Sequence, residues 1–407
     1  MPFAAESVDF ADPEVIALPQ PVLDALRDRQ PFHWNPSLKG WFATRFEDVR
    51  QVLGSPDFSV EKFGPALDRT SGEGRARLEA LAKVLGDWIV FMDPPGHTRL
   101  RRAMRTGFMP RDMDALTPKV HARVDQLLAP LEGTSRVELK DAFANPLPAM
   151  VISDLFGIPE DDIPELKIWA DQLGKFVLGG RQTPDRKRRA FEAVQDFTAY
   201  LDGLVESHRS NPRPDLTQHL IDHDEDGDRL SHEEIVHSIL LCVWAGYETT
   251  ANLIANGVMA LARNPVQAEA LARDPSGIPD AVEEFLRFEG AAQTLVRIAK
   301  TDTEVAGQPV AKNEKVFVSL FAANHDPDRF ELPGRLDTMR QRNRHMGFGH
   351  GIHLCLGAPL ARLEGRAAFE GLLKRFEGFR IVEEPAWRDE LMTRTAAALH
   401  LEWRPRR

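Results

Sequence analysis

Hydrophobic residues recur with helical spacing along most of the chain, and strand-like alternation is confined to a few short stretches. Residues 110–288 are predicted to be helical throughout, with X-Pro pairs marking the ends of helices. A strand at 40–45 is predicted to run into a helix at 46–53. Short hairpins are predicted at 295–318 and 391–403, where β-branched residues and turn signals alternate. The pattern indicates a mainly helical fold with small sheets.

The longest predicted helix runs from Ser231 to Asn264. Ser231 and Glu234 have the spacing of a capping box, and no proline interrupts the following 30 or so residues, so the helix is roughly 50 Å long. Residues 239–244 are apolar on most faces, which places the helix in the middle of the protein. Polar residues such as Glu248 favour a buried central helix over a transmembrane one.

Composition and charge narrow the class of protein. Of the 407 residues, 43% are hydrophobic and 28% are charged, as in soluble globular proteins. The net charge of −11 argues against a general nucleic-acid binder or a binder of anionic membranes. The N-terminus lacks the basic and apolar regions of a signal peptide, so a cytoplasmic protein without a membrane anchor is expected. Two cysteines, Cys242 and Cys355, are too few for a disulfide framework.

Residues 345–362 carry the most informative chemistry. Glycines alternate with other residues before Cys355 and allow the backbone to approach another group closely. Cys355 stands just before a predicted helix that has Pro359 in its first turn. The positive end of a helix dipole favours the thiolate form of a cysteine placed there. Cys355 is therefore a candidate soft, anionic metal ligand.

Other interpretations of this segment stay open. A cysteine is most often a small buried apolar residue, and a glycine-rich stretch is often only a loop. A zinc site made of His350, His353 and Cys355 is a third alternative. It is disfavoured because His353 and Cys355 are only two positions apart and the chain has no Cys-x-x-Cys partner. A dinucleotide-binding loop is disfavoured because the glycines do not follow a strand.

The stretch Phe348-Gly-His-Gly-Ile-His-Leu-Cys-Leu-Gly357 resembles the haem-ligand loop of the cytochromes P450, the haem-thiolate monooxygenases. The resemblance is to the short, soluble bacterial type and extends over nearly the whole chain. It implies that Cys355 is the axial ligand of the iron of haem b, where electron donation from the thiolate favours O–O cleavage.

The resemblance also implies the architecture. A single cytochrome P450 domain is expected over 1–407, shaped as a triangular prism of about a dozen α-helices with small β-sheets. The β-rich parts are expected at about 36–60, 290–320 and 388–404, and the helical parts at 61–289 and 350–380.

Residues 245–250 lie in the middle of the longest predicted helix. Ala245, Glu248 and Thr249 share one helix face, and an acid and a hydroxyl are costly in an apolar helix unless they have a task. A helix kink with a threonine bonded back to a preceding carbonyl is an alternative explanation. The resemblance implies that Glu248 and Thr249 are catalytic and relay protons during oxygen activation.

The resemblance implies that the haem propionates are bound by His97, Arg101, Arg297 and His353. His97 and Arg101 follow a Pro-Pro helix start at i, i+4 spacing and so project from one helix face. Arg297 lies in a predicted strand, and His353 precedes Cys355 by two residues. Partly buried propionates need cationic or donor partners. Taken alone, each of these four residues can also be interpreted as an ordinary basic residue on the surface.

Glu284 and Arg287 are an acid and a base at i, i+3 spacing, which in isolation is usually a surface pair of little consequence. The resemblance implies that they are instead a buried structural pair behind the haem loop, completed by Arg335. Leu336 departs from the family pattern, which usually has an aromatic residue there.

The resemblance implies insertion of one oxygen atom from O2 into a small hydrophobic substrate such as a terpenoid or an aromatic compound. Segments that line the substrate pocket in the family, including 291–295 and 393–397, are largely apolar here. The following residues are expected to line the pocket: Trp88, Val243, Ala245, Ala292 and Leu295. Ala292 stands where the family often has a proline.

Electrons are expected from an iron–sulfur ferredoxin and its reductase, because the chain leaves no room for a fused flavin reductase. No nucleic-acid or membrane partner is expected. Arginines near the predicted propionate helix and the cysteine loop form the expected docking patch for the acidic ferredoxin; a solvated charged surface is the alternative. These arginines are Arg102, Arg105, Arg340, Arg342, Arg344, Arg362 and Arg366.

Two rival functions stay open. A peroxide-driven haem-thiolate peroxygenase would share Cys355 but would not need an acid–alcohol pair, so Glu248 and Thr249 argue against it. A non-catalytic haem- or zinc-binding protein would need only the glycine-rich loop.

Overall fold

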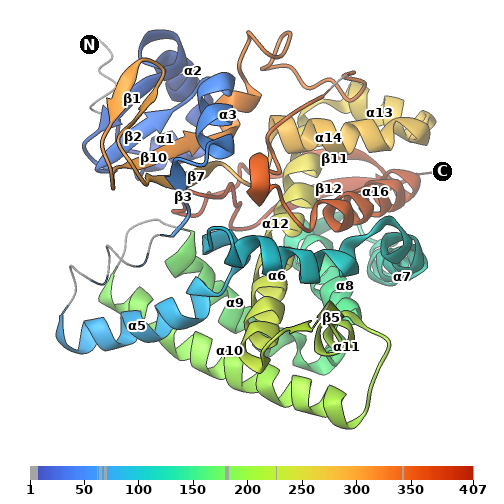
Figure 1. Ribbon diagram of the computed structural model, residues 1–407. Coiled ribbons are helices and arrows are strands. Elements are labelled where there is room, and N and C mark those ends of the chain that lie inside the picture. The colour runs from blue at the N-terminus through green and yellow to red at the C-terminus, as the bar shows by residue number, and fades with distance from the viewer. Residues whose placement is uncertain are drawn as a thin grey trace. The chain divides into compact units, whose positions relative to one another are not determined.

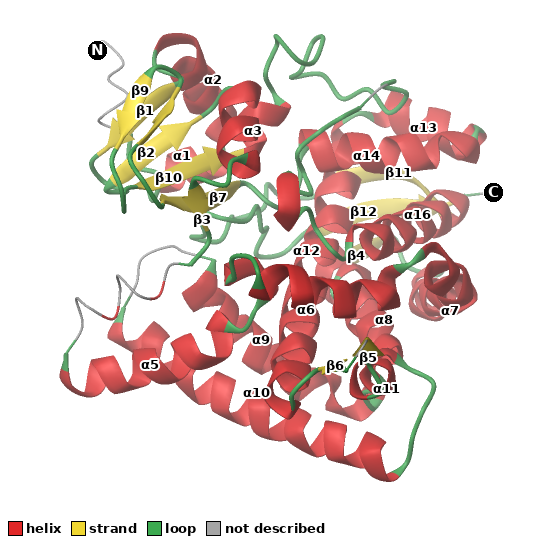
Figure 2. Cartoon of the chain, in the orientation of Figure 1, coloured by secondary structure: helices red, strands yellow, loops and turns green. Residues whose placement is uncertain are grey.

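The structure is a computed structural model that describes residues 8–61, 63, 67, 71–178, 183–225, 227–341 and 343–406. Over these residues the protein is mainly helical with small sheets, which confirms the predicted fold class (Figure 2). The chain divides into two compact units. Unit 1 consists of Met1–Ser59, Thr117–Leu147 and Thr249–Arg407, and unit 2 consists of Val60–Leu116 and Pro148–Glu248.

The longest helix, α12 (His232–Arg263), supplies residues to both units because the division falls after Glu248 (Figure 1). A reciprocal cap starts it: the Ser231 N–H donates to Glu234 Oε2 at 2.8 Å, and the Glu234 N–H donates to Ser231 Oγ at 3.2 Å. It ends before an Asn-Pro pair, since proline cannot continue a helix. The predicted long helix is confirmed.

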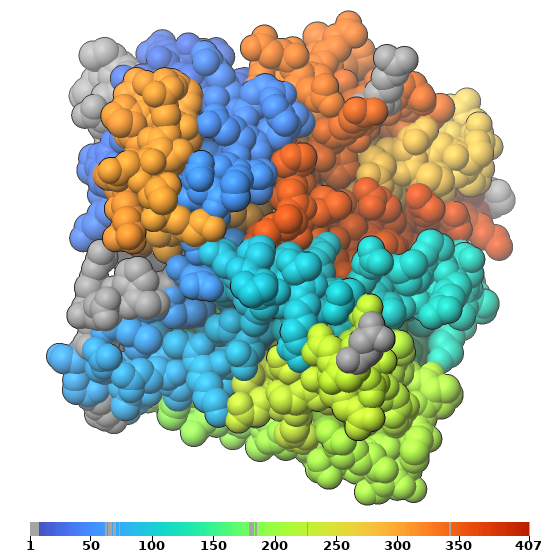
Figure 3. All heavy atoms as spheres, in the orientation of Figure 1, coloured from blue at the N-terminus to red at the C-terminus, as the bar shows by residue number. Residues whose placement is uncertain are grey.

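A five-stranded sheet in unit 1 joins residues 32–59 to residues 294–319. Its order is β1-β2-β10-β7-β3, with β2 and β10 parallel and the other pairs antiparallel. The predicted helix after β2 is confirmed as α3 (Phe46–Gly54). Figure 3 shows residues before 60 (blue) packed against the segment near 310 (orange). The strands are β1 (Phe32–Asn35), β2 (Gly40–Ala43), β3 (Phe58–Ser59), β7 (Thr294–Ala299) and β10 (Lys315–Ser319).

The smaller sheets correct two predictions. Residues 391–403 do not form a hairpin, because β12 pairs with β11 and β4 instead. Residues 110–288 are not helical throughout, since they contain β4, β5 and β6. Strands this short owe their structure to distant partners that local periodicity does not show. The strands are β4 (Arg136–Glu138), β5 (Asp224–Glu225), β6 (Asp228–Arg229), β8 (Thr303–Val305), β9 (Gln308–Val310), β11 (Phe376–Ile381) and β12 (His400–Pro405).

Helices make up most of both units. Those of unit 2 include α5 (Gly72–Gly86), α6 (Gly96–Arg105), α9 (Ile163–Val177), α10 (Pro184–Ser210) and α11 (Leu216–Ile221). Those of unit 1 include α1 (Pro13–Ala17), α2 (Pro19–Arg29), α13 (Pro265–Arg273), α14 (Ile278–Phe288), α15 (Leu320–Asn324) and α16 (Ala358–Arg375). Two further helices cross the division, α7 (Pro110–Leu128) and α8 (Pro146–Phe156). None of the helices described is long and apolar enough to cross a membrane.

Candidate active site

Cys355 lies in a tight loop that ends at α16. Its N–H donates to the Phe348 carbonyl at 2.9 Å, which closes the loop. Gly351 has a φ of 76°, and a Cβ atom there would lie 2.6 Å from the Leu53 carbonyl oxygen, so only glycine fits. Cys355 is exposed, and Pro359 lies in the first turn of α16 as predicted. Cys355 therefore lies beside the N-terminus of α16, as the sequence predicted.

A charged cluster holds this loop from behind in unit 1. Glu283 accepts two hydrogen bonds from Arg362, at 2.6 and 2.8 Å, and lies 3.1 Å from Nε2 of His345. Burial alone would raise the pKa of the Glu283 carboxyl, but these hydrogen bonds lower it to about 2. The Arg362 guanidinium also stacks over the Phe348 ring at 4.6 Å. The cluster thus connects α14, α16 and the loop.

Glu284 and Arg287 form a second, fully buried ion pair on α14. Arg287 donates to both carboxylate oxygens of Glu284 at 2.7 Å, and neither side chain is exposed. Arg287 also donates to the Asn324 and Pro333 carbonyls at 2.9 and 2.8 Å. Removing either charge would leave the other buried without its partner. The folded state of unit 1 therefore depends on both residues.

The third partner of Glu284 differs from the one that the resemblance implied. Arg340 donates to Glu284 at 3.1 Å, whereas Arg335 is exposed and contributes only its main-chain carbonyl, which accepts from Arg287 at 3.3 Å. The Asp337 N–H also donates to Glu284, at 2.9 Å. The chain therefore turns back on the pair after Arg335, and the arginine five residues later completes it.

Four further predicted site residues lie in unit 1. Arg297 is buried in β7, and His353 ends the short helix η8 (Gly351–His353). Leu295 lies beside the loop, because a Cβ atom on Gly349 would be 3.9 Å from the Leu295 side chain. Ala292 is half-buried and forms an isolated antiparallel bridge with Thr393.

Unit 2 contains the other predicted cofactor-binding residues. His97 and Arg101 lie one turn apart on α6, so they project from the same side of that helix. His97 is buried, and both its burial and the nearby Arg101 charge lower the pKa of its imidazole. The neutral imidazole can donate one hydrogen bond and accept another.

An aromatic stack marks the predicted substrate residues of unit 2. Trp88 is completely buried and stacks on Trp244 of α12 with ring centroids 5.0 Å apart. The Trp88 indole N–H has no acceptor among the residues described. Val243 is buried in the core and Ala245 is half-buried. These residues are thus largely apolar, and the Trp88 N–H is a donor without an acceptor among the residues described.

The middle of α12 is less buried than the flanking stretches 235–241 and 250–261. Ala245 and Glu248 are half-buried and Thr249 is exposed, although the helix is otherwise mostly core. A Cβ atom on Gly174 of α9 would lie 3.5 Å from Trp244 Nε1 and 3.6 Å from Glu248 Oε2, so α9 passes close to this stretch. Glu248 and Thr249, the predicted acid–alcohol pair, therefore lie on the partly exposed side of an otherwise buried helix.

The loop residues fit a cofactor-bound iron better than a zinc ion. Within the part of the chain that is described, no three His, Cys, Asp or Glu side chains converge as metal ligands. His350, His353 and Cys355 thus lack the geometry of a structural zinc site. Cys355 can act as a single thiolate ligand, and the exposed Ile352 and Leu354 beside it are suited to an apolar cofactor face.

Comparison with known proteins agrees with this site. The cytochrome P450 family profile matches residues 51–274 and 278–393. Cytochrome P450 CYP107DY1 of Priestia megaterium is 38% identical over 352 residues, 84% of each chain. The vitamin D(3) 25-hydroxylase of Pseudonocardia autotrophica is 39% identical over 354 residues, which cover 86% of this chain and 84% of that one.

A solved structure extends the likeness to the fold. P450BioI, in complex with an acyl carrier protein ligated to hexadec-9Z-enoic acid, superimposes with a TM-score of 0.90 at 31% identity and covers 97% of this chain and 100% of its own. Three observations point to the same family: the match over most of the sequence, the shared fold and the cysteine loop at the start of α16. The chain therefore belongs to the cytochrome P450 family of haem-dependent monooxygenases.

Proposed function

We propose that this cytochrome P450 inserts one oxygen atom from O2 into a C–H bond of a small, largely apolar substrate. Two electrons and two protons reduce the second oxygen atom to water. Haem b, bound through Cys355, supplies the oxygen-activating chemistry. The exposed Cys355 thiol at the start of α16, in a loop closed by backbone hydrogen bonds, is the observation that carries the proposal.

Glu248 and Thr249 would manage the protons. The Glu248 carboxyl is half-buried and the Thr249 hydroxyl is exposed on the open side of α12. A carboxyl can take up a proton from solvent, and an adjacent hydroxyl can hold one where charge develops during oxygen activation. In this proposal Glu248 supplies protons from solvent, and the Thr249 hydroxyl holds a proton next to the reacting oxygen.

Four basic residues would hold the haem propionates. His97 and Arg101 come from α6, Arg297 from β7 and His353 from η8. Arginine binds a carboxylate through two parallel N–H groups, and the buried neutral His97 adds a donor without a second charge.

The predicted pocket residues favour an apolar substrate that carries an oxygen atom. Trp88, Val243, Ala245, Ala292 and Leu295 are all aromatic or aliphatic. A substrate oxygen would accept a hydrogen bond from the buried Trp88 N–H, which has no acceptor among the residues described. Two similar proteins are named for molecules of this kind: vitamin D(3) for the hydroxylase, and an acyl carrier protein ligated to hexadec-9Z-enoic acid for the P450BioI complex. A sterol-like or fatty-acyl substrate is consistent with both.

An acidic iron–sulfur ferredoxin is the proposed electron donor, and exposed arginines without an ion-pair partner among the described residues support the choice of its docking patch. Arg344 and Arg366 of unit 1 are exposed and have no ion-pair partner among the residues described. Arg340 and Arg362 are instead engaged with the buried carboxylates of α14. Arg342 lies outside the described residues. Arg344 and Arg366 are thus the best candidates in unit 1.

Unit 2 also presents arginines to a partner. Arg102 is partly neutralised by Glu225 at 2.8 Å, whereas Arg105 has no ion-pair partner among the described residues. Both line a pocket of about 530 Å³ together with Arg111 and His223. The charge of Arg105 is not neutralised by a neighbouring carboxylate among the described residues, so it can pair with an acidic group of a ferredoxin. Arg105 is therefore a stronger candidate than Arg102 for contact with the electron donor.

Turnover with isotopically labelled dioxygen tests the proposed reaction. The purified holoenzyme is supplied with NADH, a ferredoxin reductase and a ferredoxin, and with compounds that shift its haem spectrum. We expect one labelled oxygen atom in the product. Product that forms only with hydrogen peroxide, without label from O2, would instead establish the peroxygenase alternative.

Charge reversal tests the proposed electron donor. Arg344→Glu and Arg366→Glu should slow reduction by the ferredoxin, most at low salt, and leave substrate-induced spectral changes alone. Arg188→Glu on α10 is a matched exposed control, because Arg188 already pairs with Asp185 and Glu192 on its own helix. Equal reduction rates in all three variants across a salt series would refute this docking surface.

A further inference from the structure

Lys140 is a buried lysine in unit 1 that has no task in the proposed reaction. It begins the short π-helical turn η5 (Lys140–Ala144) after β4, and only 3% of it is exposed. Its ammonium donates to the Ala396 carbonyl at 2.5 Å and lies 3.4 Å from Oδ1 of Asn252 on α12. A buried ammonium is unfavourable unless hydrogen bonds and an opposite charge compensate it.

A line of hydrogen bonds runs from Lys140 to the carboxylate of Glu390. Asn252 Nδ2 donates to Thr395 Oγ1 at 2.9 Å, and Thr395 Oγ1 donates to Thr393 Oγ1 at 3.4 Å. Thr393 Oγ1 then donates to Glu390 Oε2 at 2.6 Å. Every donor points the same way, from the ammonium of Lys140 toward the carboxylate of Glu390, so each bond polarises the next. We call these five residues the Lys140–Glu390 line.

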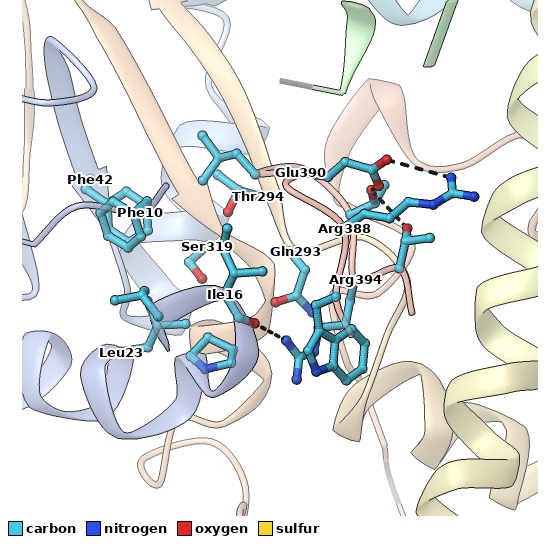
Figure 4. Close-up of a pocket in the computed structure, with 16 residues that line it drawn as sticks. Phe10, Ile16, Leu23, Phe42, Gln293, Thr294, Ser319, Arg388, Glu390 and Arg394 are labelled. Atoms are coloured by element: carbon cyan, nitrogen blue, oxygen red, sulfur yellow. Dashed lines mark hydrogen bonds and ion pairs between the residues drawn. The ribbon is translucent and has the colours of Figure 1, made fainter. Parts of the chain in front are cut away.

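Both ends of the line are buried, since Lys140 is 3% exposed and Glu390 is 9% exposed. Glu390 also lines a pocket of about 50 Å³. It forms an ion pair with Arg388, drawn as a dashed line in Figure 4, in which the two groups are 3.8 Å apart. By volume this pocket holds roughly three or four water molecules. Asn252, which follows Lys140 in the line, is completely buried. A change at Lys140 therefore acts deep in unit 1, beside α12, rather than at the surface.

The line fixes a segment that is proposed to line the substrate pocket. Ala396 and Thr395 are held by Lys140 and Asn252, and the Arg394 carbonyl accepts from Asn256 Nδ2 at 3.1 Å. Asn252 and Asn256 are one turn apart on α12 and act from the same side. Three consecutive positions of the segment are thus tied to α12 or to Lys140.

The same part of α12 carries Thr249, three residues before Asn252. The segment itself is paired on its other side, since the Arg394 N–H donates to the Ala291 carbonyl at 2.8 Å. A shift of residues 393–396 would consequently move one wall of the proposed pocket relative to the hydroxyl that acts at the oxygen.

We propose that Lys140 is a positioning residue that determines where in the substrate the oxygen is inserted. Through Asn252 and Ala396 it sets the position of residues 393–396 relative to α12. This inference rests on the proposed function, because it takes those residues to line the substrate pocket. A lysine that only stabilises the fold would alter the amount of folded enzyme and leave the position of oxidation unchanged.

The test compares variants of the full-length holoenzyme. Lys140→Met removes the ammonium and keeps a similar side-chain length, and Thr395→Val removes the hydroxyl at nearly constant volume. Thr395→Ser keeps the hydroxyl and should rescue the line. Lys119→Met, at an exposed position of α7, is the matched lysine control. Hexadecanoic acid and testosterone serve as probes, because each offers several positions for oxidation.

Two measurements separate positioning from stability. The first is the ratio of positional products at equal electron consumption; Lys140→Met and Thr395→Val should each change it about threefold or more. The second is amide hydrogen exchange of residues 391–399, which should become about tenfold faster in both variants. The double variant should change the product ratio no further than either single one, since both break the same line. Thr395→Ser and Lys119→Met should resemble the wild type.

Unchanged product ratios in folded, haem-containing Lys140→Met and Thr395→Val would overturn the proposal. If Lys140→Met does not fold, Thr395→Val and Thr393→Val still break the line and decide. If the wild type forms no product from either probe, amide hydrogen exchange decides. Exchange in Lys140→Met and Thr395→Val that is as slow as in the wild type would refute the line. Faster exchange confined to residues 391–399 would support it. Loss of dioxygen-dependent product in the wild type would count against the proposed function alone.

Discussion

The support of the cysteine loop and the middle of α12 are built in opposite ways. Behind the loop, Glu283 and Glu284 are saturated with hydrogen bonds from side chains and backbone. On α12, Glu248 and Thr249 sit on a half-open stretch of an otherwise buried helix. The loop is thus held by hydrogen bonds within the protein, whereas the polar groups on α12 are partly accessible.

This difference predicts where stability and activity reside. A buried ion pair loses several kcal/mol when one partner is removed, because the other charge stays buried. An exposed hydroxyl contributes little to folding. Substitutions behind the loop should therefore act first on the free energy of unfolding, and substitutions on the open stretch of α12 should act on turnover.

The largest effect on stability is expected at the fully buried pair. Arg287→Leu leaves the Glu284 carboxylate without its bidentate partner and should lower the free energy of unfolding by roughly 3–5 kcal/mol. Denaturant unfolding followed by circular dichroism measures this loss. A loss below about 1 kcal/mol would show that the pair does not hold the loop region together.

Glu283 should have the next largest effect, and it should depend on pH. The pKa of this carboxyl is about 2 in the folded protein against 4.5 as the ordinary value, so folding favours the carboxylate. Its contribution is complete above about pH 5.5 and is lost as the pH falls through 4.5 toward 2.

Glu283→Gln removes this contribution. The pair with Arg362 is partly exposed, with side-chain exposures of 22% and 34%, so solvent screening reduces the expected loss to about 2 kcal/mol at pH 7. Unfolding curves at pH 7 and pH 4 should differ less in Glu283→Gln than in the wild type. An equal pH dependence in both proteins would exclude Glu283 as the titrating group.

The acid–alcohol pair on α12 should change stability by no more than about 0.5 kcal/mol while it changes catalysis. Thr249→Ala should divert electrons into peroxide or water, and Glu248→Gln should slow turnover because it removes a titratable proton supplier. Product formed per NADH consumed measures the first effect, and the rate of NADH consumption measures the second. Wild-type coupling and rate in both variants would remove the pair from the mechanism.

The smallest effect is expected for an ion pair on the surface. Arg188 and Glu192 of α10 lie 2.8 Å apart with about half of each side chain exposed. Arg188→Ala should cost about 0.3–0.5 kcal/mol, and high salt should reduce that difference. A loss as large as that of Glu283→Gln would erase the contrast between buried and exposed charges.

Local signals made much of the fold predictable. The capping box of Ser231 and Glu234, the uninterrupted apolar run after it and the glycines before Cys355 each specify structure within a few residues. Those elements are where the sequence indicates: the long helix, the strand and helix near residue 45, and the cysteine loop before α16.

Contacts between distant residues were not predictable in the same way. Arg340 reaches Glu284 across 56 positions, and Lys140 reaches Ala396 across 256. Both arginines near the pair have the same chemistry, so only the path of the chain decides that Arg340 and not Arg335 completes it. Lys140 follows the short strand β4, and no local pattern indicates that its ammonium is buried.

The carbonyl spectrum of the reduced protein tests the central claim most directly. The wild type and Cys242→Ser should both show the red-shifted Soret band of a thiolate-ligated ferrous carbonyl complex, since Cys242 lies within α12. Cys355→His should bind haem but lose that band, because its axial ligand would be an imidazole. A thiolate-type spectrum that persists in Cys355→His, or that disappears in Cys242→Ser, would contradict the assignment of Cys355 as the haem ligand.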